Sequence, residues 1–185
     1  MSRTHIVYAH PSPAGFTHEV LDAFRRDLPG PSSVSDLYAM GFRSELTLDE
    51  YEARIPPPAD VLAEQSKLNA ADVWAFIYPV WWADCPAVLK GWFDRVWSVG
   101  FAYKPMTVRP ARRALVLCTA GYSVAELEAS GCYTAMRTVM LTDRIGARAT
   151  SAEFHVLGGR ASDSDGWEVT KAAHLRRVAS LARSV

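Results

Sequence analysis

The chain has 185 residues, with 49% hydrophobic side chains and a formal net charge of zero from 20 basic and 20 acidic groups. The length suits one domain spanning residues 1–185. The balanced charge argues against nucleic-acid binding, and no polybasic block or ~18-residue apolar run predicts membrane attachment or insertion. The three cysteines are widely spaced and form no CxxC pair, so we expect no metal site and a cytoplasmic protein.

Short apolar runs alternate with segments of helical spacing along the chain. The runs typical of strands are residues 5–9, 34–38, 73–78, 113–119 and 150–157. Helices are expected at 17–28, 60–70, 86–97, 125–141 and from 163 onward. Residues 39–58 are irregular and long for a connection, which makes them a candidate functional or interface loop. This alternation predicts a doubly wound α/β domain whose five-stranded parallel sheet has the order 2-1-3-4-5, with helices on both faces.

Ligands of such sheets lie beyond the carboxyl ends of the strands, and the loop at residues 9–19 is the first candidate there. It carries small and hydroxyl side chains before a helix N-terminus, which favours a bound anion such as a phosphate. His10 could donate to that anion. The alternative is an ordinary turn in which His10 caps its own backbone. The loop has neither a Walker nor a GxGxxG motif.

Two further loops follow the third and fourth strands. The loop at 79–86 reads PVWWADCP, and its adjacent tryptophans cannot both point into one packed layer. One of them could flank a planar ring, or both could pack under neighbouring loops. In the loop CTAGYS, Thr119 and Gly121 suit close approach of a ligand, although a turn that needs glycine explains them equally well. Because all three loops meet at one edge of the sheet, together they favour a ligand site.

The helix expected at 86–97 has an unusually wide apolar stripe. Its two adjacent rows are Val88, Trp92 and Val96, and Leu89, Phe93 and Trp97. Packing on one face of a sheet requires a narrower stripe. Lys90 and Arg95 on the same helix are interpreted as surface or subunit-interface ion pairs, and Cys85 and Cys118 as buried small apolar groups.

Several segments together resemble the NAD(P)H:quinone oxidoreductases of flavodoxin-like fold, the DT-diaphorase group and its bacterial relatives. The matching stretches are HPSPAGF at 10–16, DLY at 36–38, VLAEQSKLNAADVWAFIYPVWWADCPAVLKGWFDRVW at 61–97, GFAY at 100–103 and TAG at 119–121. The block from 61 to 103 is long and specific. The resemblance covers nearly the whole chain and weakens after about Tyr122.

The resemblance implies a tightly bound flavin, FMN or FAD, at these strand ends. The residues that it places around the phosphate and ribityl chain are His10, Phe16 and Thr17. Those that it places along the isoalloxazine ring are Pro79, Val80, Trp81, Trp82 and Ala83, with Thr119, Ala120 and Gly121 at the polar edge. It further implies a homodimer with sites at the subunit interface, which would explain the wide apolar stripe. Gln65 would then reach the neighbouring subunit's flavin, and Tyr103 would line the substrate side together with Trp82.

The implied activity is two-electron, ping-pong hydride transfer from NAD(P)H through the flavin to a quinone or similar flat acceptor. Alternatives are an ancillary regulatory flavoprotein of a potassium-efflux system, and an azo, nitro or FMN reductase. In longer relatives a tyrosine and a histidine follow the fourth-strand loop, where Glu126 and Cys132 stand here with Tyr122 and Tyr133 nearby. No catalytic acid is therefore assigned, and the short C-terminus leaves FMN and FAD open.

Overall fold

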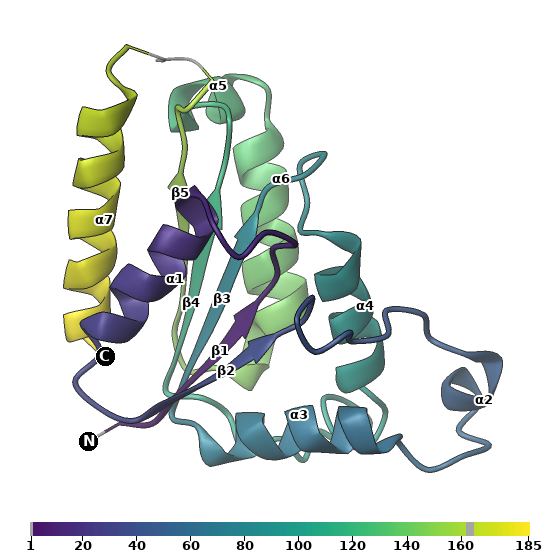
Figure 1. Ribbon diagram of the computed structural model, residues 1–185. Coiled ribbons are helices and arrows are strands. Elements are labelled where there is room, and N and C mark those ends of the chain that lie inside the picture. Colours follow the sequence, from purple (N-terminus) through teal and green to yellow (C-terminus); the bar gives the residue numbers. More distant parts are fainter. Residues whose placement is uncertain (1, 162–164) are drawn as a thin grey trace.

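The computed structural model describes residues 2–161 and 165–185. Its strands are β1 Thr4–Tyr8, β2 Ser32–Asp36, β3 Val73–Pro79, β4 Arg113–Thr119 and β5 Ala152–Leu157. They form one five-stranded sheet in the order β2-β1-β3-β4-β5, and every neighbouring pair is parallel (Figure 1). The predicted fold class and strand order are therefore confirmed.

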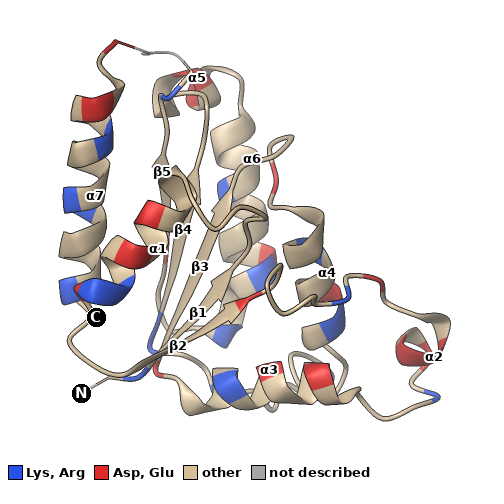
Figure 2. Cartoon of the chain, viewed as in Figure 1, with Lys and Arg blue, Asp and Glu red and all other residues tan. Residues whose placement is uncertain are grey.

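Helices cover both faces of this sheet. They are α1 Phe16–Arg26, α2 Leu48–Tyr51, α3 Ala59–Ala70, α4 Ala87–Val96, α5 Val124–Ala129, α6 Cys132–Thr138 and α7 Trp167–Arg183. In Figure 1, α1 and α7 lie on one face, α3, α4 and α6 on the other, and α2 projects away from the sheet. Both signs of charge occur on α1, α3 and α7 (Figure 2). Within the described ranges, no helix combines the length and apolar composition needed to cross a bilayer.

The inner strands β1, β3 and β4 are buried along nearly their whole length because both faces of the sheet pack against helices. Val7 lies opposite Phe76, which lies opposite Val116, and these fully buried side chains share one core with Leu89 of α4. Their alternate neighbours, such as Leu115, belong to a second core under α1 and α7. The period-two geometry of a strand divides one apolar run between two cores.

A buried carboxylate joins the sheet to α3 and α4. Glu64 is fully buried, and it accepts hydrogen bonds from Ser35 Oγ (2.8 Å), Lys67 Nζ (2.6 Å) and Trp92 Nε1 (2.9 Å). His5 Nε2 lies 3.8 Å from the same carboxylate. Burial alone would raise the pKa of Glu64, but these hydrogen bonds lower it to about 2, so the group stays ionised.

The wide stripe on α4 is covered within the chain, so the expectation that it faces a second subunit is wrong. Trp92, Phe93 and Trp97 are 0%, 4% and 8% exposed. Their rings pack against one another at centroid distances of 5.2–5.9 Å, and Trp97 also packs on Trp74. The stripe is wide because α4 lies between the sheet, α3 and the chain after α6, which sequence periodicity alone does not reveal.

Arg95 is also buried, which corrects its interpretation as a surface group. Its guanidinium donates to Glu50 (2.9 Å), to both carboxylate oxygens of Asp60 (2.6 and 3.1 Å) and to the carbonyl oxygen of Arg43 (2.9 Å). These bonds hold residues 43–60, which contain the short helix α2, against α4. The same segment approaches α4 so closely at Ser44 that a Cβ on Gly91 would lie 2.1 Å from the Ser44 carbonyl oxygen, so this position requires glycine. Lys90 does form the surface pair that was expected, with Asp94.

The predicted helix at 125–141 is instead a series of shorter elements. Gly131, with φ of 78°, separates α5 from α6, and a π-helical stretch, Val139–Ile145, and a 3₁₀ turn, Gly146–Arg148, follow. The apolar periodicity continues across the break, so it conceals the left-handed glycine. β2 lies two residues earlier than predicted. α7 begins at Trp167, and residues 163–164 of the predicted helix lie outside the described residues.

Candidate functional site

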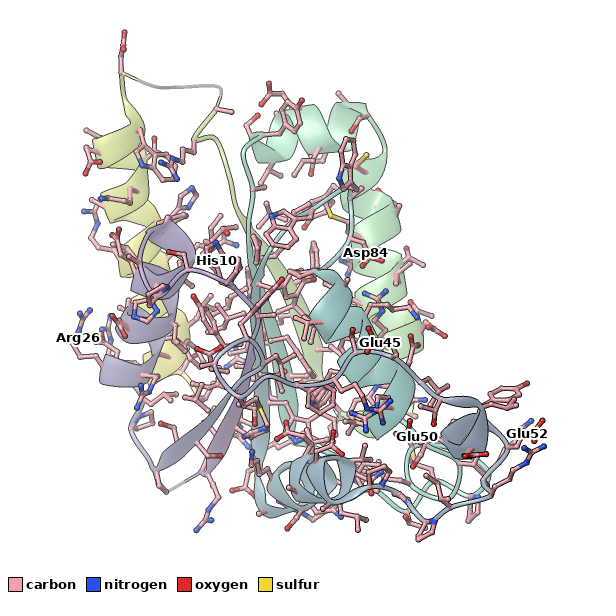
Figure 3. All side chains as sticks on the ribbon, turned by 45° about the vertical axis from the view of Figure 1, so that its right-hand side comes forward. His10, Arg26, Glu45, Glu50, Glu52 and Asp84 are labelled. Carbon is pink, nitrogen blue, oxygen red and sulfur yellow. The ribbon has the colours of Figure 1, made fainter. Side chains whose placement is uncertain are left out.

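Two adjoining hollows lie at the carboxyl ends of β1, β3 and β4. The larger has a volume of about 650 Å³ and the smaller about 340 Å³. Val80, Ala120 and Gly121 line both, so the two hollows adjoin along these residues. Figure 3 shows His10 and Asp84 on loops at this end of the sheet, Glu50 on the projecting α2 and Glu52 directly after that helix. The predicted convergence of three loops is thus confirmed, because parallel strands present their carboxyl ends at one edge.

The smaller hollow has the features of an anion site. The loop before α1 supplies His10, Ser12 and Gly15 to its lining, and the first turn of α1 supplies Phe16 and Thr17. Gly15 precedes α1 with φ of 95°, and no side chain caps the first N–H groups of that helix. These donors and the helix dipole favour a negative group.

His10 combines the two roles that the sequence left open. Its Nδ1 lies 3.0 Å from the backbone nitrogen of Ser12 and 3.1 Å from the oxygen of Ser12, so the ring caps its own loop. Nε2 has no protein partner among the described residues and is available to a ligand in the smaller hollow. The interpretation as a local cap therefore does not exclude a ligand contact.

A hydroxyl pair links the first loop to the third. The Oγ1 atoms of Thr17 and Thr119 lie 2.7 Å apart, and both residues are buried. The amide of Val80 donates to the carbonyl oxygen of Thr119 at 2.7 Å, which joins the second loop to the same point. The sequence predicted that each threonine lies at the site, but it held no sign that they bond to each other across 102 positions.

The paired tryptophans lie on a tight turn. Trp81 and Asp84 exchange two backbone hydrogen bonds, of 2.9 and 3.0 Å, around Trp82 and Ala83. Both central residues are left-handed, with φ of 51° and 55°, as in a type I′ turn. Such turns favour asparagine and glycine, and each left-handed residue of another type costs about 1–3 kcal/mol.

The turn gives the two indoles different places. Trp82 is fully exposed (101%) and lines the larger hollow, whereas Trp81 is 41% exposed and lines the smaller. The alternative in which both indoles pack under neighbouring loops is therefore wrong. Trp74 of β3, Trp92 of α4 and Trp97 directly after α4 are core residues.

The third loop is held by the chain that follows β5. Gly159 N donates to the carbonyl oxygen of Tyr122 at 3.1 Å, and Ala161 N donates to that of Gly121 at 2.9 Å. A Cβ on Gly158 would lie 2.2 Å from the Tyr122 oxygen, so this approach requires glycine. The contact brings Arg160, which we did not predict, to the lining of the smaller hollow. The only sequence signal was a Gly-Gly-Arg triplet after the fifth strand.

The larger hollow has an apolar floor and a few polar side chains. Tyr122, Glu126, Ser130 and Cys132 belong to its lining. The Glu126 carboxylate accepts hydrogen bonds from the backbone and hydroxyl of Ser123, both at 2.7 Å, as the capping box of α5. The two residues that stand in place of the relatives' tyrosine and histidine, Glu126 and Cys132, thus both border the hollow.

Other candidates lie elsewhere. Tyr133 packs edge-on against Phe154, at a centroid distance of 5.8 Å. Cys85 and Cys118 are buried as expected, and burial raises the pKa of Cys85 to about 12 and that of Cys118 further still. Neither is a ready thiolate at neutral pH.

Within one chain, Gln65 and Tyr103 are not brought to the strand ends. Gln65 is 8% exposed, and its Nε2 donates to Val96 O and to Ser98 Oγ, both at 3.0 Å. Tyr103 is 42% exposed and lines a separate hollow between the segment around α2 and the end of α4. Their roles at a subunit interface stay predictions.

Comparison with known proteins gives this geometry a family. Residues 2–150 match the family described by a flavodoxin-like fold. An NAD(P)H:quinone oxidoreductase from Methanothermobacter marburgensis is 41% identical, with a TM-score of 0.90 over 98% of this chain and 94% of that one. The chain belongs to the NAD(P)H:quinone oxidoreductase family of flavodoxin-like fold. The resemblance inferred from the strand-end motifs is thereby confirmed.

Other relatives of this family differ in length and distance. NAD(P)H dehydrogenase (quinone) 1 from Rattus norvegicus is 33% identical over 167 residues, which are 75% of this chain and 60% of that protein. The chain spans about half the length of the curated relatives it matches. An FMN-dependent NADH-azoreductase from Bacillus anthracis str. Ames Ancestor, solved in complex with FMN, is 14% identical with a TM-score of 0.65 over 98% of this chain and 100% of that one. That likeness shows a common fold alone.

Proposed function

We propose that this chain is a flavin-dependent NAD(P)H:quinone oxidoreductase. It would transfer two electrons from a nicotinamide to a quinone or a similar flat acceptor. The observation that supports this most directly is the adjacency of the two hollows. An anion-suited pocket at the start of α1 adjoins a larger, mainly apolar hollow along Val80, Ala120 and Gly121. A phosphate joined to a planar ring requires this combination.

The described residues fit a flavin in size and chemistry. Both volumes lie within the range of about 300–1,000 Å³ that is common for ligand pockets. The free N–H groups of α1, the Nε2 of His10 and the cation of Arg160 would hold the phosphate. Pro79 to Ala83 would lie along the ring, with the Trp82 indole as a wall.

A bound flavin supplies the hydride chemistry, and the residues of this chain position and polarise the reactants. The N–H of Gly121 has no acceptor among the described residues, so it can donate to a ring edge that becomes negative on reduction. Trp82 and the apolar floor would stack flat donors and acceptors in turn and exclude water. Orientation of this kind accounts for much catalysis without a protein nucleophile.

The finer features of this function are also proposals. Either FMN or FAD would be the tightly bound flavin, and NADH or NADPH the donor. A homodimer would complete each site with Tyr103 and Gln65 of the other subunit. Tyr103 shares a hollow with the segment at 43–58, where Leu48 and Tyr51 are 61% and 75% exposed. This exposure is compatible with a contact surface.

The test begins with the colour of the purified protein. We expect a yellow protein, and mass spectrometry of the released chromophore distinguishes FMN from FAD. A screen of NADH and NADPH against quinones and azo dyes then identifies donor and acceptor. A colourless protein that takes up neither flavin would refute the proposal, and so would a flavoprotein that oxidises neither nucleotide with any quinone.

A further inference from the structure

The turn that carries Trp82 is unfavourable by its own sequence. Trp82 and Ala83 have Cβ atoms and occupy left-handed positions that glycine or asparagine would adopt more readily. Only the two backbone bonds between Trp81 and Asp84 close the turn from within. Since such conformations persist where the surroundings enforce them, the source of the constraint must lie outside the turn.

Arg144 contacts the end of the turn from another part of the chain. Its Nη1 and Nη2 donate to Oδ1 and Oδ2 of Asp84 at 2.7 and 3.0 Å, a bidentate pair with the last residue of the turn. Asp84 Oδ1 also accepts the backbone N–H of Cys85 at 2.7 Å. The carboxylate is therefore fixed on two sides, and with it the end of the turn.

Arg144 is itself held rigidly in the protein. Its side chain is 6% exposed, and the guanidinium lies over the ring of Phe93 at 5.3 Å. Nη1 also lies 3.3 Å from Cys85 Sγ and 3.4 Å from Met140 Sδ, and the carbonyl oxygen accepts from Trp97 Nε1 at 2.7 Å. It belongs to the π-helical stretch Val139–Ile145, a geometry that recurs at functional sites.

From these contacts we propose that Arg144 is a positioning residue. Through Asp84 it holds Trp82 and Ala83 in the left-handed turn, and so keeps the Trp82 indole as a preformed wall of the larger hollow. The identity of the ligand beside the Trp82 indole rests on the proposed function, whereas the constraint on the turn does not. Without Arg144 the turn is expected to relax toward ordinary backbone conformations, which moves the indole away from the hollow.

The test compares three variants. Arg144→Met removes the guanidinium and keeps an apolar side chain over Phe93. Arg144→Met with Ala83→Gly adds a residue that adopts positive φ without strain, so the turn needs less support. Arg95→Met is the matched control, because Arg95 is equally buried, pairs with both oxygens of Asp60 and lies 5.0 Å from the Phe42 ring.

The first measurement is amide hydrogen exchange at Trp81 and Asp84 in flavin-free protein. Arg144→Met should speed exchange by roughly 10- to 100-fold, the range for loss of a charged hydrogen-bonded partner. Ala83→Gly should reverse most of this increase, and Arg95→Met should leave these two amides unchanged. Equal exchange in wild type and Arg144→Met, or equal acceleration in Arg95→Met, would overturn the proposal.

The second measurement is steady-state turnover with NADH or NADPH and a quinone. Arg144→Met should raise KM for the quinone roughly 3- to 10-fold, the scale of a stacking contact, with a smaller change in kcat, and Ala83→Gly should restore KM. A faster exchange with unchanged KM would refute the positioning role while leaving the proposed function intact. A wild-type protein that binds no flavin would refute the proposed function. Amide hydrogen exchange would still test whether Arg144 constrains the turn.

A variant that retains the guanidinium covers the case in which Arg144→Met does not fold. Asp84→Asn keeps Arg144 over Phe93 and removes only the charge and one acceptor oxygen from the pair. It should speed amide exchange at Trp81 and raise KM for the quinone, as Arg144→Met should. Unchanged values in a folded Asp84→Asn protein would overturn the proposal.

Discussion

Replacement of Trp82 by alanine should separate binding from folding at the site. The indole is fully exposed, so its removal uncovers no core, and alanine keeps the Cβ that strains the left-handed backbone. The free energy of unfolding should change by less than about 0.5 kcal/mol, as for other surface substitutions. Loss of one aromatic stacking contact, about 0.5–1.5 kcal/mol, should weaken flavin or quinone binding by about 2- to 12-fold.

Urea unfolding followed by far-UV circular dichroism measures the stability of this variant. Titration of flavin-free protein with flavin, and KM for a quinone, measure the binding. Trp92→Ala is the matched control, since the same truncation in the fully buried Trp92 should cost about 3–5 kcal/mol. If Trp82→Ala lost more than about 2 kcal/mol, or if flavin affinity and KM were both unchanged, Trp82 would not be a wall of the site.

Three further substitutions test the structure around the site. Glu64→Gln should cost about 3–5 kcal/mol at pH 7, because the donors around this buried position lose their anion. The pKa of Glu64 is lowered on folding, so its ionised form stabilises the wild type fully above pH 4.5, and this stabilisation is lost as the pH falls toward 2. The difference in urea stability between wild type and Glu64→Gln should therefore be smaller at pH 3 than at pH 7. A difference that does not change with pH contradicts this. Thr17→Val should lower the free energy of unfolding by about 1–3 kcal/mol, because it leaves Thr119 Oγ1 without its partner. The double variant Thr17→Val/Thr119→Val should lose less stability than the sum of the two single variants. Strict additivity in this double-mutant cycle refutes the coupling. Gly91→Ala should cost about 1–3 kcal/mol and loosen residues 43–58 in hydrogen exchange, because the new Cβ would lie 2.1 Å from Ser44 O; a stability equal to wild type refutes the close approach.

Local sequence patterns determined the architecture of this protein. Runs bounded by turn residues marked all five strands, and the central ones are strongly apolar because both faces of a central parallel strand are covered. The run at 73–78 differs from β3 by one residue, and that at 113–119 coincides with β4. Because a parallel sheet gathers its strand ends at one edge, the same patterns located the three loops of the site.

Tertiary structure decided which side chains meet there. Arg144 and Asp84 lie 60 positions apart, and Arg160 reaches the smaller hollow through a contact that Gly158 permits. The width of the α4 stripe showed that the helix is buried, but the stripe could not distinguish a partner subunit from the rest of the chain. Hydrophobic periodicity reports that a face is covered, and only the folded chain shows what covers it.

The two tryptophans illustrate the same division. Their position after a buried strand was readable from the sequence, and so was the need for at least one to lie at the rim. Their different exposures depend on a left-handed turn that Trp82 and Ala83 would not adopt by themselves. That conformation is set by contacts from distant parts of the chain, and local propensity carries no information about them.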